Sequence, residues 1–388
     1  MTPAERSAVR DQVLRRLSPD RSAIAEVRRY CESPFVNVRV PTPVFPLQAE
    51  PHVGDWRRYV TEAGADVFGY LQERLPQLAV PVREGVSKTP AYADVVLRGK
   101  PFRSEDFDGR LALERPAELR LYVHEHPAGA LPVLVAAHRG DFETLVRALA
   151  WRGEPRPISS SVNAQIVTGF INWDRMGRHR AAWAAGLDPS AAERVWPAEM
   201  ARVAGSERWR YQDRFVITCV RPYSGVTGAD LGLEMGEAEW LERSTRLRVE
   251  HEFTHYATHR VFDAMSLNLL DETLADFMGT TYALGSFRAA WFTRFLGLES
   301  WPDVRPDGRV HTYASELSGP AFSLLCAVAV QAARGLEGLG RAFYSPAERG
   351  RFLLALAAMT LELLASDEAP SLFGEAYEAA GQLTGATD

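Results

Sequence analysis

The sequence predicts an α+β protein in which a strand-containing N-terminal lobe of mixed helices and strands, residues 1–230, precedes a helical C-terminal lobe, residues 231–388. Three observations carry this prediction. Strand-like segments end at about residue 220, helical periodicity is the regular pattern beyond about residue 236, and a chain of 388 residues exceeds the roughly 250–300 residues at which one hydrophobic core usually stops growing. We therefore expect two lobes with a boundary near residue 230.

The N-terminal lobe begins with a predicted helical cap over residues 1–31. Apolar residues recur there at helical spacing, and Ser18-Pro19-Asp20 divides them into two short amphipathic helices. Residues 35–40 alternate between apolar and polar side chains before a proline-rich turn, which is typical of a strand. Helical periodicity returns from Trp56 to Leu78.

The remainder of this lobe mixes strands with helices. Asp141 is well placed as the N-cap of a helix over 142–151, and a second helix is expected near 175–185. Residues 159–164 are interpreted as an edge strand suited to holding an extended peptide. The other predicted strands are 119–124, 131–137, 166–171 and 214–220.

Helical periodicity dominates the C-terminal lobe. Loops rich in Gly, Pro and Asp separate its apolar-periodic segments near 224–236 and 301–310. The predicted helices are 237–262, 269–284, 288–296, 315–334, 350–366 and 371–382.

Composition excludes several classes of protein. A net charge of −6 and a pI near 5.9 argue against nucleic acid as a partner, because phosphate-binding domains need a concentrated basic field. The three cysteines lie far apart with no CxxC spacing, so we expect reduced thiols and no thiolate metal site. The N-terminus lacks a leader-like apolar run and no apolar stretch reaches a membrane-spanning length. We expect a cytoplasmic protein without a membrane partner, and the sequence specifies no oligomeric state.

The string His251-Glu252-Phe253-Thr254-His255 is an HExxH motif inside the predicted helix 237–262. Two histidines four residues apart lie one helical turn apart on a common face, where both imidazoles reach one metal ion. Glu252 lies beside that face, where its carboxylate can act as a general base. The opposing interpretation is that both histidines are hydrogen-bonded core residues.

A third ligand must come from elsewhere, because zinc with two protein ligands is weakly held. A metzincin would need a glycine at Thr258 and a histidine at Val261, so that class is excluded. Glu272 is the natural third ligand, because sixteen intervening residues allow the chain to turn and return as an antiparallel helix. Asp276 lies one turn beyond Glu272, where it can accept the outer N–H of a ligand histidine.

Residues 251–276 resemble the gluzincins, the thermolysin-like zinc peptidases in which HExxH is completed by a glutamate in an ExxxD context. The resemblance implies Zn²⁺ bound by His251, His255 and Glu272, Glu252 as the catalytic carboxylate, and Asp276 as a partner of a ligand histidine. A strand-containing lobe followed by a helical one, with the HExxH helix near the junction, is also similar to that zincin-like architecture. Related peptidases use a later His or Tyr to stabilise the oxyanion, and the candidates here are His311 and Tyr313.

The sequence therefore predicts a zinc-dependent metallopeptidase that cleaves a peptide or protein with Glu252 as the base. Two alternatives stay open. The site can hydrolyse a non-peptide amide, since its chemistry constrains the electrophile more than the leaving group. A zinc-stabilised binding or regulatory protein without turnover is the other alternative, but a purely structural zinc site tends to have four protein ligands and needs no base.

Overall fold

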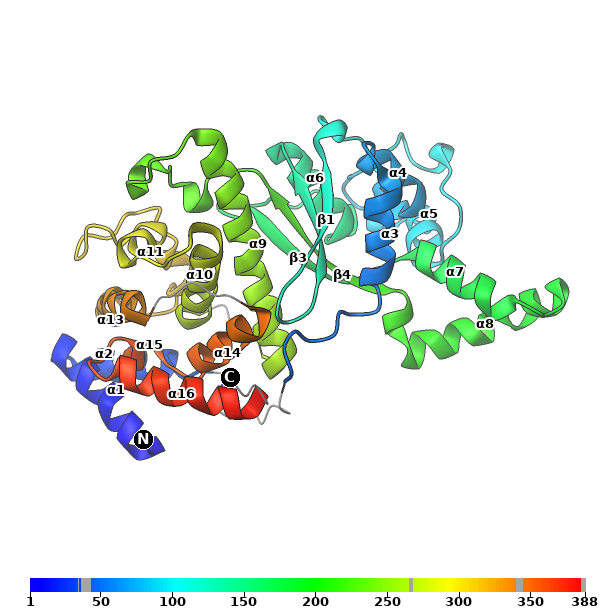
Figure 1. The fold of residues 1–388 in the computed structure, drawn as a ribbon. Helices are drawn as coiled ribbons and strands as arrows, with labels where there is room; N and C mark the ends of the chain where they lie inside the picture. The colour runs from blue at the N-terminus through cyan, green and yellow to red at the C-terminus, as the bar shows by residue number, and fades with distance from the viewer. Residues whose placement is uncertain (34, 36–42, 265–267, 340–344, 385–388) are drawn as a thin grey trace. The chain divides into compact units, whose positions relative to one another are not determined.

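A computed structural model describes most of the chain and shows an α+β protein (Figure 1). The predicted strand at 35–40 lies outside the described part of the chain except for Phe35, which is buried. The described residues are 1–33, 35, 43–264, 268–339 and 345–384.

The chain forms two compact units, whose bounds differ from the predicted lobes. Unit 1 contains residues 1–48, 126–129 and 221–388, and unit 2 contains residues 49–125 and 130–220. The change of unit at residue 221 lies near the predicted boundary at 230. The N-terminal cap, however, belongs to unit 1 and not to the strand-containing lobe.

Long-range packing explains the place of the cap. Helix α1 (Pro3–Leu17) packs against α13 (Gly319–Leu339) and α15 (Leu361–Leu364), and α2 (Arg21–Tyr30) packs against α13. Arg10 on α1 also pairs at 2.8 Å with Glu362, whose side chain is fully buried. Periodicity reports the apolar face of a helix but not which distant element covers it.

A four-stranded sheet organises unit 2, in the order β1-β2-β4-β3. Strand β1 (Arg120–His124) runs antiparallel to β2 (Leu131–Ala136), β2 runs parallel to β4 (Gln212–Cys219), and β3 (Ala164–Ile171) is an edge strand antiparallel to β4. The predicted edge strand at 159–164 therefore begins only at Ala164. Helices α3 (Val53–Ala63) and α6 (Arg139–Leu149) pack on the sheet.

Two further predictions for this unit need correction. Asp141 is not the N-cap of α6, which is His138; its buried carboxylate instead accepts the backbone N–H groups of Glu114 and Arg115 at 2.7 and 2.9 Å. The helix predicted over 56–78 is divided at Gly64, whose φ of 55° ends α3 before α4 (Val67–Arg74).

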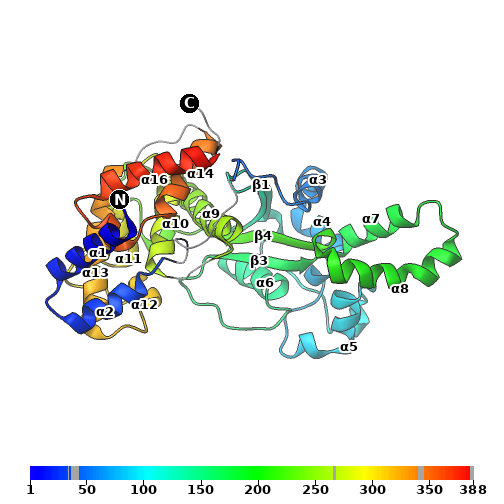
Figure 2. The ribbon, with the colours of Figure 1, turned by 90° about the horizontal axis from the view of Figure 1, so that it is seen from below.

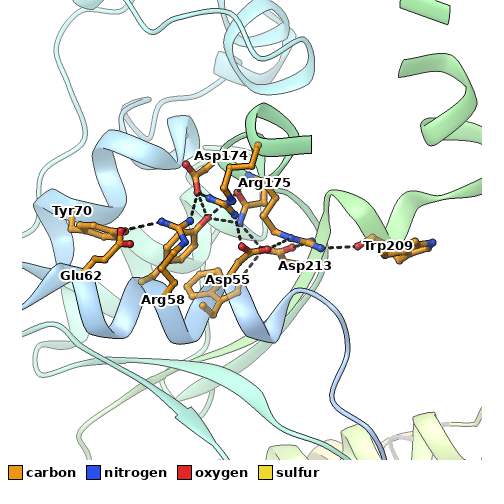
Figure 3. A network of polar contacts seen from close by, with 12 residues as sticks. Asp55, Arg58, Glu62, Tyr70, Asp174, Arg175, Trp209 and Asp213 are labelled. Carbon is orange, nitrogen blue, oxygen red and sulfur yellow. Dashed lines mark hydrogen bonds and ion pairs between the residues drawn. The ribbon is translucent and has the colours of Figure 1, made fainter. Parts of the chain in front are cut away.

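Between β3 and β4 the chain forms a helical hairpin that the sequence predicted only in part. Its two helices, α7 (Trp173–Ala184) and α8 (Pro189–Ser206), project away from the sheet of unit 2 (Figures 1 and 2). A network of ion pairs fixes its base, where Arg175 reaches Asp55 and the fully buried Asp213 (Figure 3).

Unit 1 is helical, and α9 (Glu237–Phe262) and α10 (Leu269–Leu284) have the predicted bounds. The helix predicted over 350–366 is interrupted at Thr360, whose side chain caps the start of α15. The remaining helices are α11 (Ala289–Leu296), α12 (Val310–Tyr313), α14 (Pro346–Ala357) and α16 (Ala369–Thr384).

Within the described ranges, α13 is the one helix long and apolar enough to cross a membrane. Half of its most apolar window is buried inside the protein, and helices α1, α2, α11 and α15 pack against it. Core packing therefore accounts for its apolar residues.

Candidate metal centre

Helices α9 and α10 bring the predicted metal ligands together. His251 and His255 lie one turn apart on α9, and both are buried. Glu272, in the first turns of α10, is also buried, with 4% of its surface exposed. A carboxylate so deeply buried needs a compensating positive charge or several hydrogen bonds.

A glycine allows the two helices to approach closely. A Cβ atom on Gly279 of α10 would lie only 2.8 Å from the backbone oxygen of Leu247 on α9, so no larger residue fits without displacing a helix. The side chain of Asn268 fixes the start of α10 by accepting the N–H of Asp271 at 3.0 Å. These local features hold Glu272 opposite the two histidines.

Potential ligand atoms of three side chains converge at distances suited to zinc. The Nε2 atoms of His251 and His255 are 3.1 Å apart. The Nε2 atom of His251 lies 3.5 Å from Oε2 of Glu272, and the Nε2 atom of His255 lies 3.5 Å from Oε1 of the same carboxylate. Tetrahedral ligands at about 2.0–2.1 Å from zinc are separated from one another by about 3.3–3.4 Å. Among the described residues, these three form the group of histidine and carboxylate side chains able to hold a metal ion.

Two aspartates orient the imidazoles toward this point. The Nδ1 atom of His251 lies 2.9 Å from Oδ1 of Asp276, and the Nδ1 atom of His255 lies 3.3 Å from Oδ2 of Asp271. With each Nδ1–H directed at a carboxylate, each Nε2 presents its lone pair to the other. Two such lone pairs repel unless a proton or a metal cation lies between them.

The surrounding acids make the site favourable for a cation. Burial by itself lowers the pKa of His255, but its hydrogen bond to Asp271 and the charges of Asp271 and Glu272 raise that pKa to about 9. In the metal-free protein His255 is therefore protonated at neutral pH. The same negative field that retains this proton attracts a divalent cation.

Tyr223 and Arg309 surround the carboxylate of Asp276. The Tyr223 hydroxyl donates a hydrogen bond to Asp276, and Arg309 donates to it at 2.8 Å. Arg309 also lies 3.4 Å from Glu272. Burial favours the neutral form of Asp276, yet Arg309 and His251 hold its pKa below the ordinary value. Asp276 is therefore an ionised acceptor beside His251.

The expected catalytic residues fall in different surroundings. Glu252 is half-buried and forms no hydrogen bond or ion pair with the described residues, so its carboxylate is available to a substrate or water. Tyr313 lies close to the site: burial raises the pKa of its phenol and the nearby charge of Glu272 raises it further, while Arg309 opposes both. Tyr313 therefore remains a hydrogen-bond donor.

His311 is not brought to the metal ligands. Its side chain is exposed, its Nε2 lies 3.1 Å from the backbone oxygen of Arg305, and its ring stacks on Phe322 at 5.1 Å. His311 and Tyr313 both lie on the short helix α12. Their side chains point to different surroundings, because residues two apart on a helix face different directions. Of the two predicted oxyanion donors, the structure places Tyr313 beside Glu272.

Sequence reasoning missed three residues of this site: Asp271, Tyr223 and Arg309. Asp271 carried a usable signal, since it directly precedes Glu272 and the second histidine also needs an acceptor for its Nδ1–H. Tyr223 begins a short 3-10 helix, Tyr223–Gly225, and Arg309 directly precedes α12, and no spacing rule connects either residue with the motif.

Comparison with known families matches the chain from residue 12 to residue 368 with a family of unknown function, DUF7005. The chain belongs to this family, and the match includes every residue of the metal centre. No curated protein and no solved structure matches the chain.

Proposed function

We propose that this protein is a zinc-dependent hydrolase, a metallopeptidase of the gluzincin type with a zincin-like fold, acting in the cytoplasm. One observation carries the proposal. The Nε2 atoms of His251 and His255 lie 3.1 Å apart and share the carboxylate of Glu272, although both Nδ1 atoms are already directed at aspartates. Only a proton or a metal cation between the two Nε2 atoms removes the repulsion of their lone pairs. A ligand set of two imidazole nitrogens and a carboxylate suits zinc.

The surrounding residues have distinct roles in this proposal. His251, His255 and Glu272 would hold a zinc ion, which would supply a Lewis acid for a substrate carbonyl and lower the pKa of a bound water. Glu252 accepts a proton from the attacking water and passes it to the leaving nitrogen. Tyr313 donates a hydrogen bond to the carbonyl oxygen as negative charge develops there. Asp271 and Asp276 hold the ligand imidazoles in the tautomer that presents Nε2.

Unit 2, considered by itself, has a feature suited to binding an extended peptide. Strand β3 is at the edge of its sheet, and a groove of about 400 Å³ is lined by residues 165–171 of this strand together with residues 148–152. An exposed edge offers backbone donors and acceptors to an extended peptide.

The available carboxylate of Glu252 counts against the alternative of a zinc-stabilised protein without turnover, because such a protein has no need of a general base.

The test is a comparison of Glu252→Gln with the parent protein. We expect the variant to retain zinc and to lose about 10²–10⁴-fold in turnover of a peptide found by screening a peptide library, because the general base is gone while the ligands remain. Glu239→Gln, at an exposed site on the same helix, is the matched control and should retain parental turnover. Parental activity in Glu252→Gln would refute this mechanism.

A further inference from the structure

The hydroxyl of Tyr30, at the end of α2, connects two segments of the metal centre. It accepts the backbone N–H of Leu269 at 2.8 Å and donates to the backbone oxygen of Tyr313 at 3.0 Å. Leu269 is the first residue of α10, and Tyr313 is the last residue of α12. One side chain from the N-terminal region thus fixes the distance between these segments.

The contact with Leu269 acts on the part of α10 that carries a metal ligand. The first N–H groups of a helix have no partner inside the helix. Asn268 satisfies the N–H of Asp271, and Tyr30 supplies from another helix the acceptor for Leu269. The first turn, which carries Asp271 and Glu272, is therefore held by one local cap and one distant cap.

The contact with Tyr313 acts on the other side of the centre. Arg309, directly before α12, contacts both Glu272 and Asp276. Tyr313 lies at the end of this helix, and the charge of Glu272 raises the pKa of its phenol. A shift of α12 relative to α10 would move both side chains away from the metal ligands.

Further contacts anchor the same region of the N-terminal segment. Glu26 on α2 accepts the backbone N–H and the hydroxyl of Ser318, each at 2.7 Å. The ring of Phe35 packs against Phe262 at the end of α9, with centroids 5.1 Å apart. Tyr30 and Phe35 together therefore contact all three helices of the site, α9, α10 and α12.

We propose that Tyr30 is a positioning residue of the metal centre, and that the two N-terminal helices form an integral part of this centre through its hydroxyl. The inference rests on the metal site of the proposed function but does not depend on the reaction. Removing the hydroxyl leaves Leu269 without its acceptor and frees α12 to move relative to α10. The three ligand atoms then meet less often at the separation that zinc requires.

The test measures zinc affinity in the full chain carrying Tyr30→Phe, by competition with a chromogenic chelator, and thermal unfolding of the metal-free protein. We expect zinc affinity to fall about tenfold, as when a group orienting a metal ligand is lost. Tyr92→Phe is the matched control, because Tyr92 is a buried tyrosine of unit 2; its affinity should stay within about twofold of the parent. A tyrosine that only stabilised the fold would lower the unfolding temperature and leave zinc affinity unchanged.

Equal zinc affinities of the parent and Tyr30→Phe would overturn this inference alone, whereas a parent protein that binds no zinc would overturn the proposed function as well. If Tyr30→Phe does not fold, Glu26→Gln replaces it, since this partly exposed side chain anchors the same helix at Ser318. A severalfold loss of zinc affinity supports the inference, and parental affinity in Glu26→Gln overturns it.

Discussion

The two units each contain a cluster of buried polar side chains, and the clusters differ in how their groups are satisfied. In unit 2, Asp213 is fully buried, but Arg175 donates to its carboxylate (Figure 3). Asn172 and Trp56 also donate to this carboxylate. Neighbouring carboxylates are also paired with arginines, as Asp174 is with Arg58. Donors and acceptors match throughout this network.

The metal centre of unit 1 lacks this balance. Its carboxylates are those of Glu252, Asp271, Glu272 and Asp276, and Arg309 pairs with two of them, Glu272 and Asp276. Two imidazole nitrogens also face each other across 3.1 Å. A matched network needs no ligand, whereas a cluster of acceptors with excess negative charge needs a cation. The comparison predicts that substitutions in unit 2 change stability and that substitutions in the metal centre change metal affinity.

The largest effect on stability is expected for Asp213→Ala. Removing this carboxylate leaves Arg175 buried without its principal counter-charge, which typically costs about 3–5 kcal/mol of unfolding free energy. Urea denaturation measures the loss. Zinc affinity of the folded fraction should remain parental, and reduced affinity together with unchanged stability would show that the two clusters do not differ as described.

A smaller effect, on metal affinity, is expected for Asp276→Asn. The amide preserves the shape of the side chain but removes the charge that orients His251 and pairs with Arg309. We expect zinc affinity to fall about 10–100-fold, measured by chelator competition. Asp263→Asn, at an exposed position at the end of α9, is the control. Equal affinities of the two variants would contradict the role of Asp276.

Zinc affinity should also depend on pH. His255 must lose a proton to bind zinc, and in the metal-free protein its pKa is raised from 6.5 to about 9. Affinity should therefore increase about tenfold for each pH unit between 7 and 9. The stability of the metal-free protein should change with pH in the opposite direction from zinc affinity. The stability gained from protonated His255 is complete below pH 6.5 and is lost as the pH rises through about 9. Calorimetric titration with zinc at several pH values measures the affinity, and urea denaturation of the metal-free protein measures the stability. A flat pH profile in both would contradict the raised pKa.

The parts of the fold that local patterns determine could be predicted from the sequence. Apolar residues at helical spacing gave the bounds of α9 and α10, and alternating or apolar runs gave the strands of the sheet. Helix α8 was not predicted, because most of its residues are exposed and it has little apolar periodicity. The place of α1 and α2 in unit 1 depends on contacts with helices more than 280 residues away in the chain, which no local pattern encodes.

The site likewise contains residues that could be predicted from local patterns and residues that could not. The HExxH spacing and the later ExxxD spacing predict which residues converge, because both are properties of single helices. The arginine and tyrosine around Asp276 belong to other segments, Tyr223 to a short 3-10 helix and Arg309 to the residue before α12. The Tyr30 hydroxyl comes from the N-terminal region of the chain. His311 was a reasonable candidate by residue type, but its position on α12 directs it to Arg305 and Phe322.

Metal analysis of the purified protein and of His251→Ala tests the central claim most directly. The convergence of His251, His255 and Glu272 predicts one zinc ion per parent chain. In the variant it predicts a loss of affinity greater than the roughly 10–100-fold caused by removing an orienting group. Equal zinc content in the two proteins after dialysis against a chelator, or a parent chain that takes up no zinc, would contradict the account.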